Sequence, residues 1–114
     1  MAKYEASLSG NFDELLGRIN DGILKGSVSA SFEAGSDYRC GDIRCAVRVY
    51  ERYSLIGSNR VSMNITLVGQ GENLFVSVIT SGGSQAMFFK INTFGEGSFL
   101  DRAVEIIERY KNGG

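Results

Sequence analysis

Hydrophobic and polar residues alternate along most of this chain, and this alternation predicts β-strands. A strand that buries one face repeats every two residues, whereas a helix repeats every 3.6. Most of the alternating segments have one polar face, which is typical of a sheet covered on one side only. The predicted strands span residues 3–8, 27–34, 43–52, 61–68, 74–80 and 86–91.

The last two predicted strands form the most hydrophobic part of the sequence. They are separated by residues 81–85, Ser-Gly-Gly-Ser-Gln, whose glycines allow the positive φ of a tight reversal. Both strands are rich in β-branched and aromatic residues. We therefore expect a β-hairpin over residues 74–91 at the centre of the fold.

Two segments have helical spacing instead. The first begins after Asn11, which stands three residues before Glu14 as in a capping box, and ends at Gly26. The second begins near Ser98, with Asp101 three residues on, and runs to about Lys111. The hydrophobic stripes of the two helices are Phe12, Leu15, Leu16, Ile19, Ile23 and Leu24 in the first, and Phe99, Leu100, Ala103, Val104, Ile107 and Tyr110 in the second.

The predicted order is β-α-β-β-β-β-β-α, which favours a single α+β domain over residues 1–114. Consecutive strands joined by short polar turns favour an antiparallel meander of five to six strands. Each helix is hydrophobic on one side, so both are expected to pack on the same face of the sheet. The order is similar to TBP-like and helix-grip domains, in which a terminal helix lies across a curved antiparallel sheet.

Composition excludes several classes of function. The 12 Lys and Arg residues nearly balance the 13 Asp and Glu residues, so nucleic acid and anionic membranes are not expected partners. No segment has the length of a membrane span or the pattern of a signal peptide, so we expect a cytoplasmic protein. The chain has no histidine, and its two cysteines do not have zinc-site spacing, so no metal, cofactor or acid-base catalysis is predicted.

Arginines follow one parity of the predicted strand 43–52. Arg44, Arg48 and Arg52 share that face with Tyr50 and Ala46, while Ile43, Cys45, Val47 and Val49 form the other face. We expect the arginine face to meet solvent and Cys45 to lie in the core. A row of guanidinium groups could bind a carboxylate or phosphate, or it could be a solvated surface paired with Glu51 or Glu72.

The predicted central hairpin leaves hydrophobic residues on both of its faces. If Leu74, Val76 and Val78 face the helices, then Phe75 and Ile79 face away. In the returning strand, one of two sets must also face away, either Met87, Phe89 and Ile91 or Ala86, Phe88 and Lys90. In the second case, Phe88 would join Phe75 and Ile79. An exposed patch of this kind indicates a partner surface or self-association, although scattered exposed aromatics or a covering loop would also explain it.

Three stretches of the sequence, MAKYEASLSGNFDELL, CAVRVYERYS and ITSGGSQAMFFKINTFGEGSFLD, resemble a family of small bacterial proteins of similar length. That family is known only as a domain of unknown function, and the resemblance covers nearly the whole chain. It implies a bacterial cytoplasmic setting and supplies no activity or site residue.

The leading functional hypothesis is a non-catalytic binding module that self-associates through the outer face of the sheet, using Phe75, Ile79 and Phe88. The alternative is a small-molecule carrier with an apolar pocket between the sheet and the 98–111 helix. In that alternative, Arg44, Arg48, Arg52 and Tyr50 would bind the acidic group of a ligand. An enzyme is the third possibility, disfavoured by the missing histidine.

Overall fold

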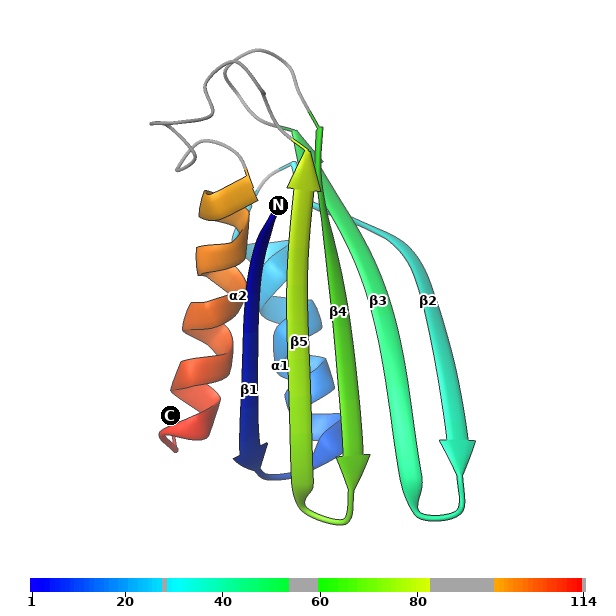
Figure 1. Ribbon diagram of the computed structural model, residues 1–114. Helices are drawn as coiled ribbons and strands as arrows, with labels where there is room; N and C mark the ends of the chain where they lie inside the picture. Colours follow the sequence, from blue (N-terminus) through cyan, green and yellow to red (C-terminus); the bar gives the residue numbers. More distant parts are fainter. Residues whose placement is uncertain (28, 54–59, 83–95, 114) are drawn as a thin grey trace.

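The computed structural model describes residues 1–27, 29–53, 60–82 and 96–113, and these form one five-stranded antiparallel sheet with two helices (Figure 1). The order of the strands across the sheet is β1-β5-β4-β3-β2. The strands are β1 (Ala2–Ser9), β2 (Ser31–Cys40), β3 (Ile43–Tyr53), β4 (Arg60–Gln70) and β5 (Asn73–Gly82). This confirms the predicted α+β class.

Strands β2 to β5 form the expected meander. Strand β1 pairs with β5 and extends the sheet on that side. Two of the meander's turns have two residues each, 41–42 between β2 and β3 and 71–72 between β4 and β5. Gly41 and Gly71 both have φ of 60°, a conformation that suits the first central residue of a primed hairpin turn. These turns fix the register of the strands on either side.

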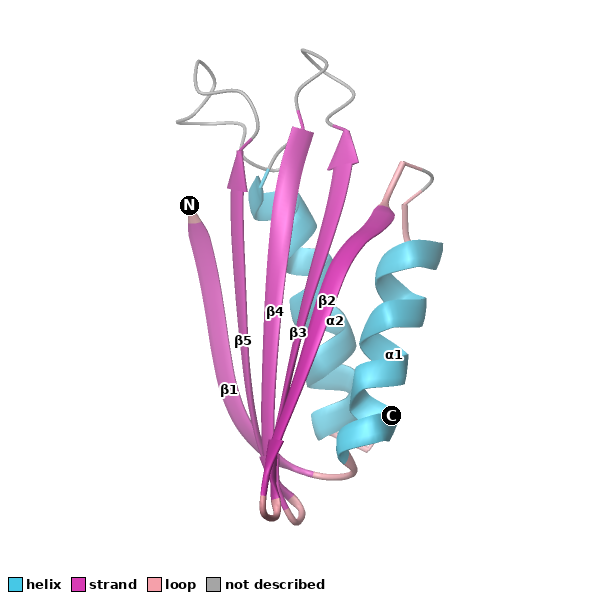
Figure 2. Ribbon diagram, turned by 90° about the vertical axis from the view of Figure 1, so that its right-hand side faces the viewer, coloured by secondary structure: helices cyan, strands magenta, loops and turns pink. Residues whose placement is uncertain are grey.

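Both helices, α1 (Phe12–Lys25) and α2 (Glu96–Lys111), lie on the same face of the sheet, as predicted (Figure 2). They pack against each other, α2 against β5, β1 and β4, and α1 against β4. Between helices and sheet lies the core: Phe12, Leu15, Ile19, Ile23, Ala46, Tyr50, Val61, Met63, Ile65, Leu67, Leu74, Val76, Val78, Phe99, Ala103 and Ile107. Burial of these side chains is the main force that holds the two layers together.

The N-terminus of α1 is capped by residues from both helices. The Asn11 side chain accepts a hydrogen bond from the Glu14 backbone N–H at 2.8 Å, as the predicted capping box requires. In a simple capping box, the Glu14 carboxylate would accept from the Asn11 N–H. Here the Tyr110 hydroxyl stands between them, accepting from the Asn11 N–H at 2.9 Å and donating to Glu14 Oε1 at 3.0 Å. A side chain of α2 therefore completes the cap of α1.

Two element boundaries differ from the predictions. A second strand was predicted correctly, but its bounds of 27–34 are wrong: β2 starts at Ser31 and continues through residues 35–40, which were expected to be a loop. All ten of its residues are exposed, so burial imposes no hydrophobic alternation on its sequence. Helix α2 begins at Glu96, so Ser98 lies within its first turn and is not its cap.

The central hairpin can be checked only in its first strand. Strand β5 extends through Ser81 and Gly82, two residues beyond the predicted strand end, and pairs there with Ser62 and Val61. The predicted strand 86–91, which includes Phe88, lies outside the described residues.

Candidate interaction surface

The arginine-bearing face of β3 is turned towards the helices, so its predicted orientation is wrong. Ala46 and Tyr50, which share this face with the arginines, are fully buried, and Tyr50 lies opposite the buried Met63 of β4. The hydrophobic set Ile43, Cys45, Val47 and Val49 is on the outer face instead. Cys45, expected in the core, is accordingly a partly exposed free thiol.

Long arginine side chains fit this side because the helices cover it incompletely. An arginine can pack its aliphatic stem and planar head against a neighbour while its charge reaches water. Arg44 lies over the Phe12 ring at 4.1 Å from the ring centroid, and Arg52 over the Phe99 ring at 4.9 Å. Both aromatic rings belong to the helices, so these arginines fasten the helices to β3.

Arg44 also forms a two-pronged ion pair with Asp13 of α1. Its two terminal nitrogens donate to the two Asp13 carboxylate oxygens, each at 2.9 Å. This hydrogen bonding holds the pKa of Asp13 below its usual value and raises the pKa of Arg44. The pair is solvent-accessible, so it orients α1 more than it stabilises the fold.

Arg48 is held by the neighbouring strand. It donates to Asp37 of β2 at 3.0 Å and to the Ser36 carbonyl of β2 at 3.3 Å, as well as to the carbonyl of Val47 in its own strand at 2.9 Å. Neither acidic residue proposed as a partner of the arginine row fills that role, since Glu51 pairs with Arg60 at 2.8 Å and Glu72 forms no ion pair with a described residue. The three arginines thus have separate partners, and their grouping into one ligand-binding row remains an untested prediction.

Tyr50 is part of the contact between β3 and α1. Its ring is buried, and its hydroxyl donates a 2.8 Å hydrogen bond to Asn20 of α1. Burial, with a smaller effect of Asp21, raises the pKa of Tyr50 to about 12, although the charge of Arg48 acts in the opposite direction. This hydroxyl therefore stays protonated at neutral pH and links β3 to α1.

The outer face of the sheet carries a hydrophobic row that crosses four strands. Phe75 of β5 lies opposite Val68 of β4, Val68 opposite Cys45 of β3, and Cys45 opposite Tyr38 of β2. Phe75 is 39% exposed and Tyr38 is 67% exposed. The outward orientation of Phe75 and Ile79 was predicted and is confirmed, because Leu74, Val76 and Val78 are buried while Phe75 and Ile79 are exposed.

Further hydrophobic side chains border this row. We call the whole set the outer patch, which consists of Phe75, Val68, Cys45, Tyr38, Ile43, Val47, Val49 and Ile79. Sequence reasoning did not place Tyr38, Ile43 and Val68 in this patch. Ile43 and Val68 belong to alternating strands, so their parity was visible, whereas Tyr38 stands in a segment expected to be a loop.

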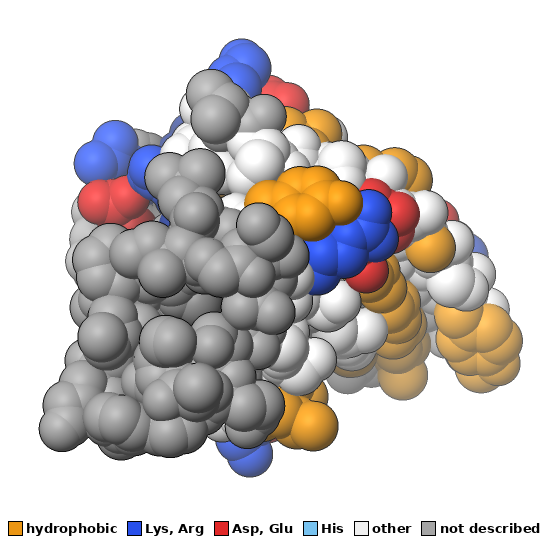
Figure 3. All heavy atoms as spheres, turned by 90° about the horizontal axis from the view of Figure 1, so that it is seen from above, with side chains coloured by type: hydrophobic (Ala, Val, Ile, Leu, Met, Phe, Trp, Pro, Cys, Tyr) orange, Lys and Arg blue, Asp and Glu red, His pale blue; other side chains and the backbone are white. Residues whose placement is uncertain are grey.

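Charged residues on this face lie around the outer patch and not within it. On β1, Lys3 lies opposite Ile79 and Glu5 lies opposite Ser77. Between the patch residues, β4 and β5 present Asn64, Thr66 and Ser77, all uncharged. The described charges on the outer side of β3 and β4 are Glu51 and Arg60, which pair with each other near one end of the sheet. Viewed from above, hydrophobic side chains lie along the part of the surface that belongs to β2 and β3 (Figure 3).

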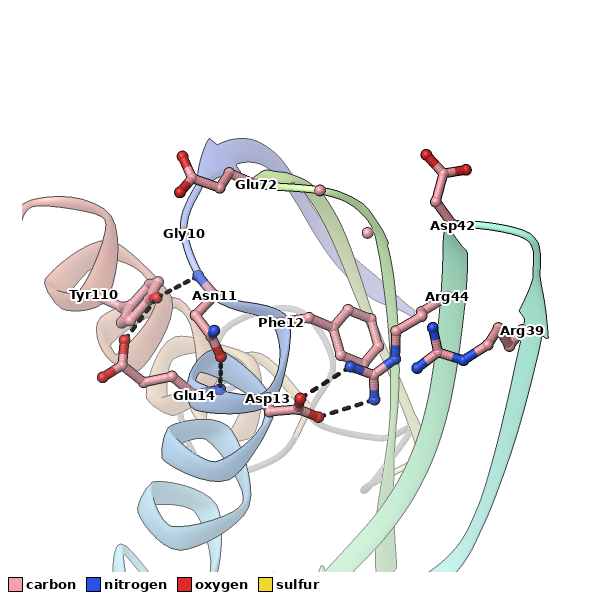
Figure 4. Close-up of a pocket in the computed structure, with 12 residues that line it drawn as sticks. Gly10, Asn11, Phe12, Asp13, Glu14, Arg39, Asp42, Arg44, Glu72 and Tyr110 are labelled. Atoms are coloured by element: carbon pink, nitrogen blue, oxygen red, sulfur yellow. Dashed lines mark hydrogen bonds and ion pairs between the residues drawn. The ribbon is translucent and has the colours of Figure 1, made fainter.

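A separate hollow of about 590 Å³ opens at the N-terminus of α1 (Figure 4). It lies between the start of this helix and the turns of the two hairpins, and its lining is mainly polar and charged. Arg44 and Asp13 meet within it, and Tyr110 closes it beside Asn11. This hollow is not the predicted apolar pocket between the sheet and α2.

Two further observations concern the described residues only. They contain no group of three or more Cys, Asp or Glu side chains placed to hold a metal ion. Neither of the two described helices is both long and hydrophobic enough to cross a membrane.

Comparison with known proteins identifies the family but not an activity. No curated protein matches the sequence. One family model, described as a family of unknown function (DUF6054), matches residues 1–111. This agrees with the resemblance noted in the sequence. Because the match spans nearly the whole chain, the protein belongs to DUF6054, a family of unknown function.

Proposed function

We propose that this protein is a non-catalytic interaction module of the cytoplasm that self-associates through the outer patch. The observation that carries the proposal is the row from Phe75 through Val68 and Cys45 to Tyr38, four neighbouring hydrophobic positions on a face that no described element covers. Extended hydrophobic patches on a protein surface usually mark interaction sites.

The absence of charge on the patch favours a second copy as the partner. Protein interfaces have few charged residues at their centre and more hydrophobic and aromatic ones. A patch without charges can face its own copy without repulsion, and a two-fold contact needs the same surface on both subunits. A sheet face suits such packing, because two sheets can stack about 10 Å apart with interlocking side chains.

The test is a Phe75→Asp variant, studied by sedimentation velocity over a wide range of concentrations. The wild type should form species heavier than its 12.4 kDa monomer. The variant should lose the association made through this face and form less of the heavy species, because each face contact would bury an unpaired carboxylate. Since Phe75 points away from the core, the circular dichroism of the variant should match that of the wild type.

The matched control is Asn112→Asp, which adds the same charge at an exposed position after α2. It should associate like the wild type. If the wild type is monomeric at every concentration, or if Phe75→Asp and Asn112→Asp associate equally, the outer patch is not a self-association surface.

A further inference from the structure

Strand β2 is an open edge of the sheet. Only β3 pairs with it among the described strands, and all ten of its residues are exposed. Natural proteins usually protect such an edge with proline, lysine, a short strand or a covering element. Strand β2 contains neither proline nor lysine, and its bulge near Glu33 leaves the stretch from Ala34 to Cys40 in regular register. That stretch can accept another strand.

The turn at residues 41–42 determines which backbone groups are free. Cys40 and Ile43 close this two-residue turn, so their backbone N–H and C=O groups point towards each other. Hydrogen-bonding direction alternates along an antiparallel strand. Tyr38 and Ser36 therefore also bond towards β3, whereas the backbone groups of Arg39 and Asp37 point to the open edge.

The side chains of Asp37 and Arg39 have incomplete charge compensation. Arg39 stands directly opposite Arg44 of β3, and like charges in that position repel. Arg44 is neutralised by Asp13, but Arg39 forms no ion pair within the described part of the chain. Asp37 is paired with Arg48, yet its side chain remains 66% exposed and can accept a second donor.

We propose that β2 pairs antiparallel with β2 of a second copy, about a two-fold axis at Tyr38. This register places Asp37 opposite Arg39 of the partner subunit, and the symmetry makes that ion pair twice. Both residues direct their backbone groups to the open edge, so they form the hydrogen-bonded pairs of the new ladder. Tyr38 then lies beside its own copy on the outer face.

This contact uses the edge of the sheet, whereas the proposed function uses its outer face, and either can exist without the other. The two-fold axis is perpendicular to the sheet, so the two outer patches would lie side by side in one continuous sheet. Testing the edge in the Phe75→Asp background removes the face contact. The failure of one proposal is then distinguishable from the failure of the other.

The first experiment exchanges charges between two variants. In the Phe75→Asp background, Asp37→Arg alone places arginine opposite arginine, and Arg39→Asp alone places aspartate opposite aspartate. Each should be monomeric in sedimentation velocity. An equimolar mixture should form a heterodimer, because both of its ion pairs are attractive. A mixture that stays monomeric, while the parent protein dimerises, overturns the register.

The second experiment uses disulfide cross-linking, which also captures weak association. In a Phe75→Asp, Cys40→Ser, Cys45→Ser background, Tyr38→Cys should form a covalent dimer under mild oxidation, because facing residues of a non-hydrogen-bonded pair lie within disulfide reach. Ser36→Cys in the same background is the control. Ser36 would face residue 40 of the partner subunit, so it should remain monomeric.

Retaining Cys40 supplies a positive counterpart to that control. In the Phe75→Asp background, the Ser36→Cys, Cys45→Ser protein should cross-link through Cys40 of the partner subunit. Cross-linking of Ser36→Cys without Cys40 would indicate a different register and overturn the proposal. Absence of cross-linking in the Tyr38→Cys variant would overturn edge pairing altogether.

Discussion

Removal of one hydroxyl group, in Tyr110→Phe, tests whether α2 completes the cap of α1. The hydroxyl accepts from the Asn11 N–H at 2.9 Å and donates to Glu14 at 3.0 Å. It also sits close to Gly10: a Cβ atom placed there would be 2.6 Å from the hydroxyl oxygen. The hydroxyl is tightly packed on the side of Gly10, whereas its other side borders the hollow, from which water can reach it.

The magnitude follows from the two hydrogen bonds. Each contributes about 1 kcal/mol in typical proteins, and partial exposure of the site keeps the sum near 1–2 kcal/mol. With an unfolding entropy of about 2.1 cal/mol/K per residue, a chain of 114 residues loses about 4 °C in Tm per kcal/mol. Tyr110→Phe should therefore lower Tm by about 4–8 °C.

The assay is thermal and urea unfolding followed by far-ultraviolet circular dichroism. Tyr38→Phe is the matched control, because Tyr38 is 67% exposed and its hydroxyl has no hydrogen bond to another described residue. It should leave Tm unchanged. Asn11→Ala removes the direct cap and should lower the free energy of unfolding by about 1 kcal/mol. The reasoning is refuted if Asn11→Ala shows this loss while Tyr110→Phe has the same Tm as the wild type.

Three further predictions concern packing and ionisation. Gly69→Ala should lower the free energy of unfolding in urea by about 1–3 kcal/mol, because a Cβ atom there would lie 2.7 Å from the Phe12 ring. Gly17→Ala, in α1, has no atom near the added Cβ and should raise the free energy of unfolding by about 0.5–1 kcal/mol. The pKa of Asp13 is lowered in the folded state, so the stability that its ion pair contributes is present above the ordinary carboxyl pKa and is lost as pH falls through the lowered value. The urea midpoints of the wild type and Asp13→Asn should therefore differ at pH 7 and converge in acid. Burial raises the pKa of Tyr50 to about 12, so the stability it contributes is present below pH 10 and lost between about pH 10 and 12. Burial and the Glu108 carboxylate raise the pKa of Tyr4 to about 12 as well, so phenolate absorbance of the folded protein should show a late titration of two tyrosines, which Tyr50→Phe reduces to one.

The sequence predicted those elements whose hydrophobic pattern is set by burial on one side. Strand β1 alternates because α2 covers one of its faces, and α1 has both a cap and a hydrophobic stripe. Phe75 and Ile79 were placed on the correct face for the same reason. Strand β2 was misplaced because exposure on both faces leaves turn-forming and strand-forming residues equally acceptable there.

The reversed faces of β3 have a different cause. One parity holds Ile43, Val47 and Val49, and the other holds Ala46 and Tyr50 with three arginines, so simple hydrophobicity favours burying the wrong set. Pairing with β4 decides the matter, since Tyr50 lies opposite the buried Met63. Arginine is tolerated on the buried side because Phe12 and Phe99 offer aromatic rings at the margins of the helix layer.

The position of Tyr110 near the end of the chain means that the cap of α1 can be completed only late in translation. Asn11 leaves the ribosome 99 residues before the tyrosine that receives its N–H. Strand β1 likewise waits for β5, its neighbour across the sheet. Until α2 has been synthesised, the Asn11 side chain can cap the start of α1, but the Asn11 N–H lacks the Tyr110 hydroxyl. Completion of this fold therefore depends on contacts between its earliest and latest segments.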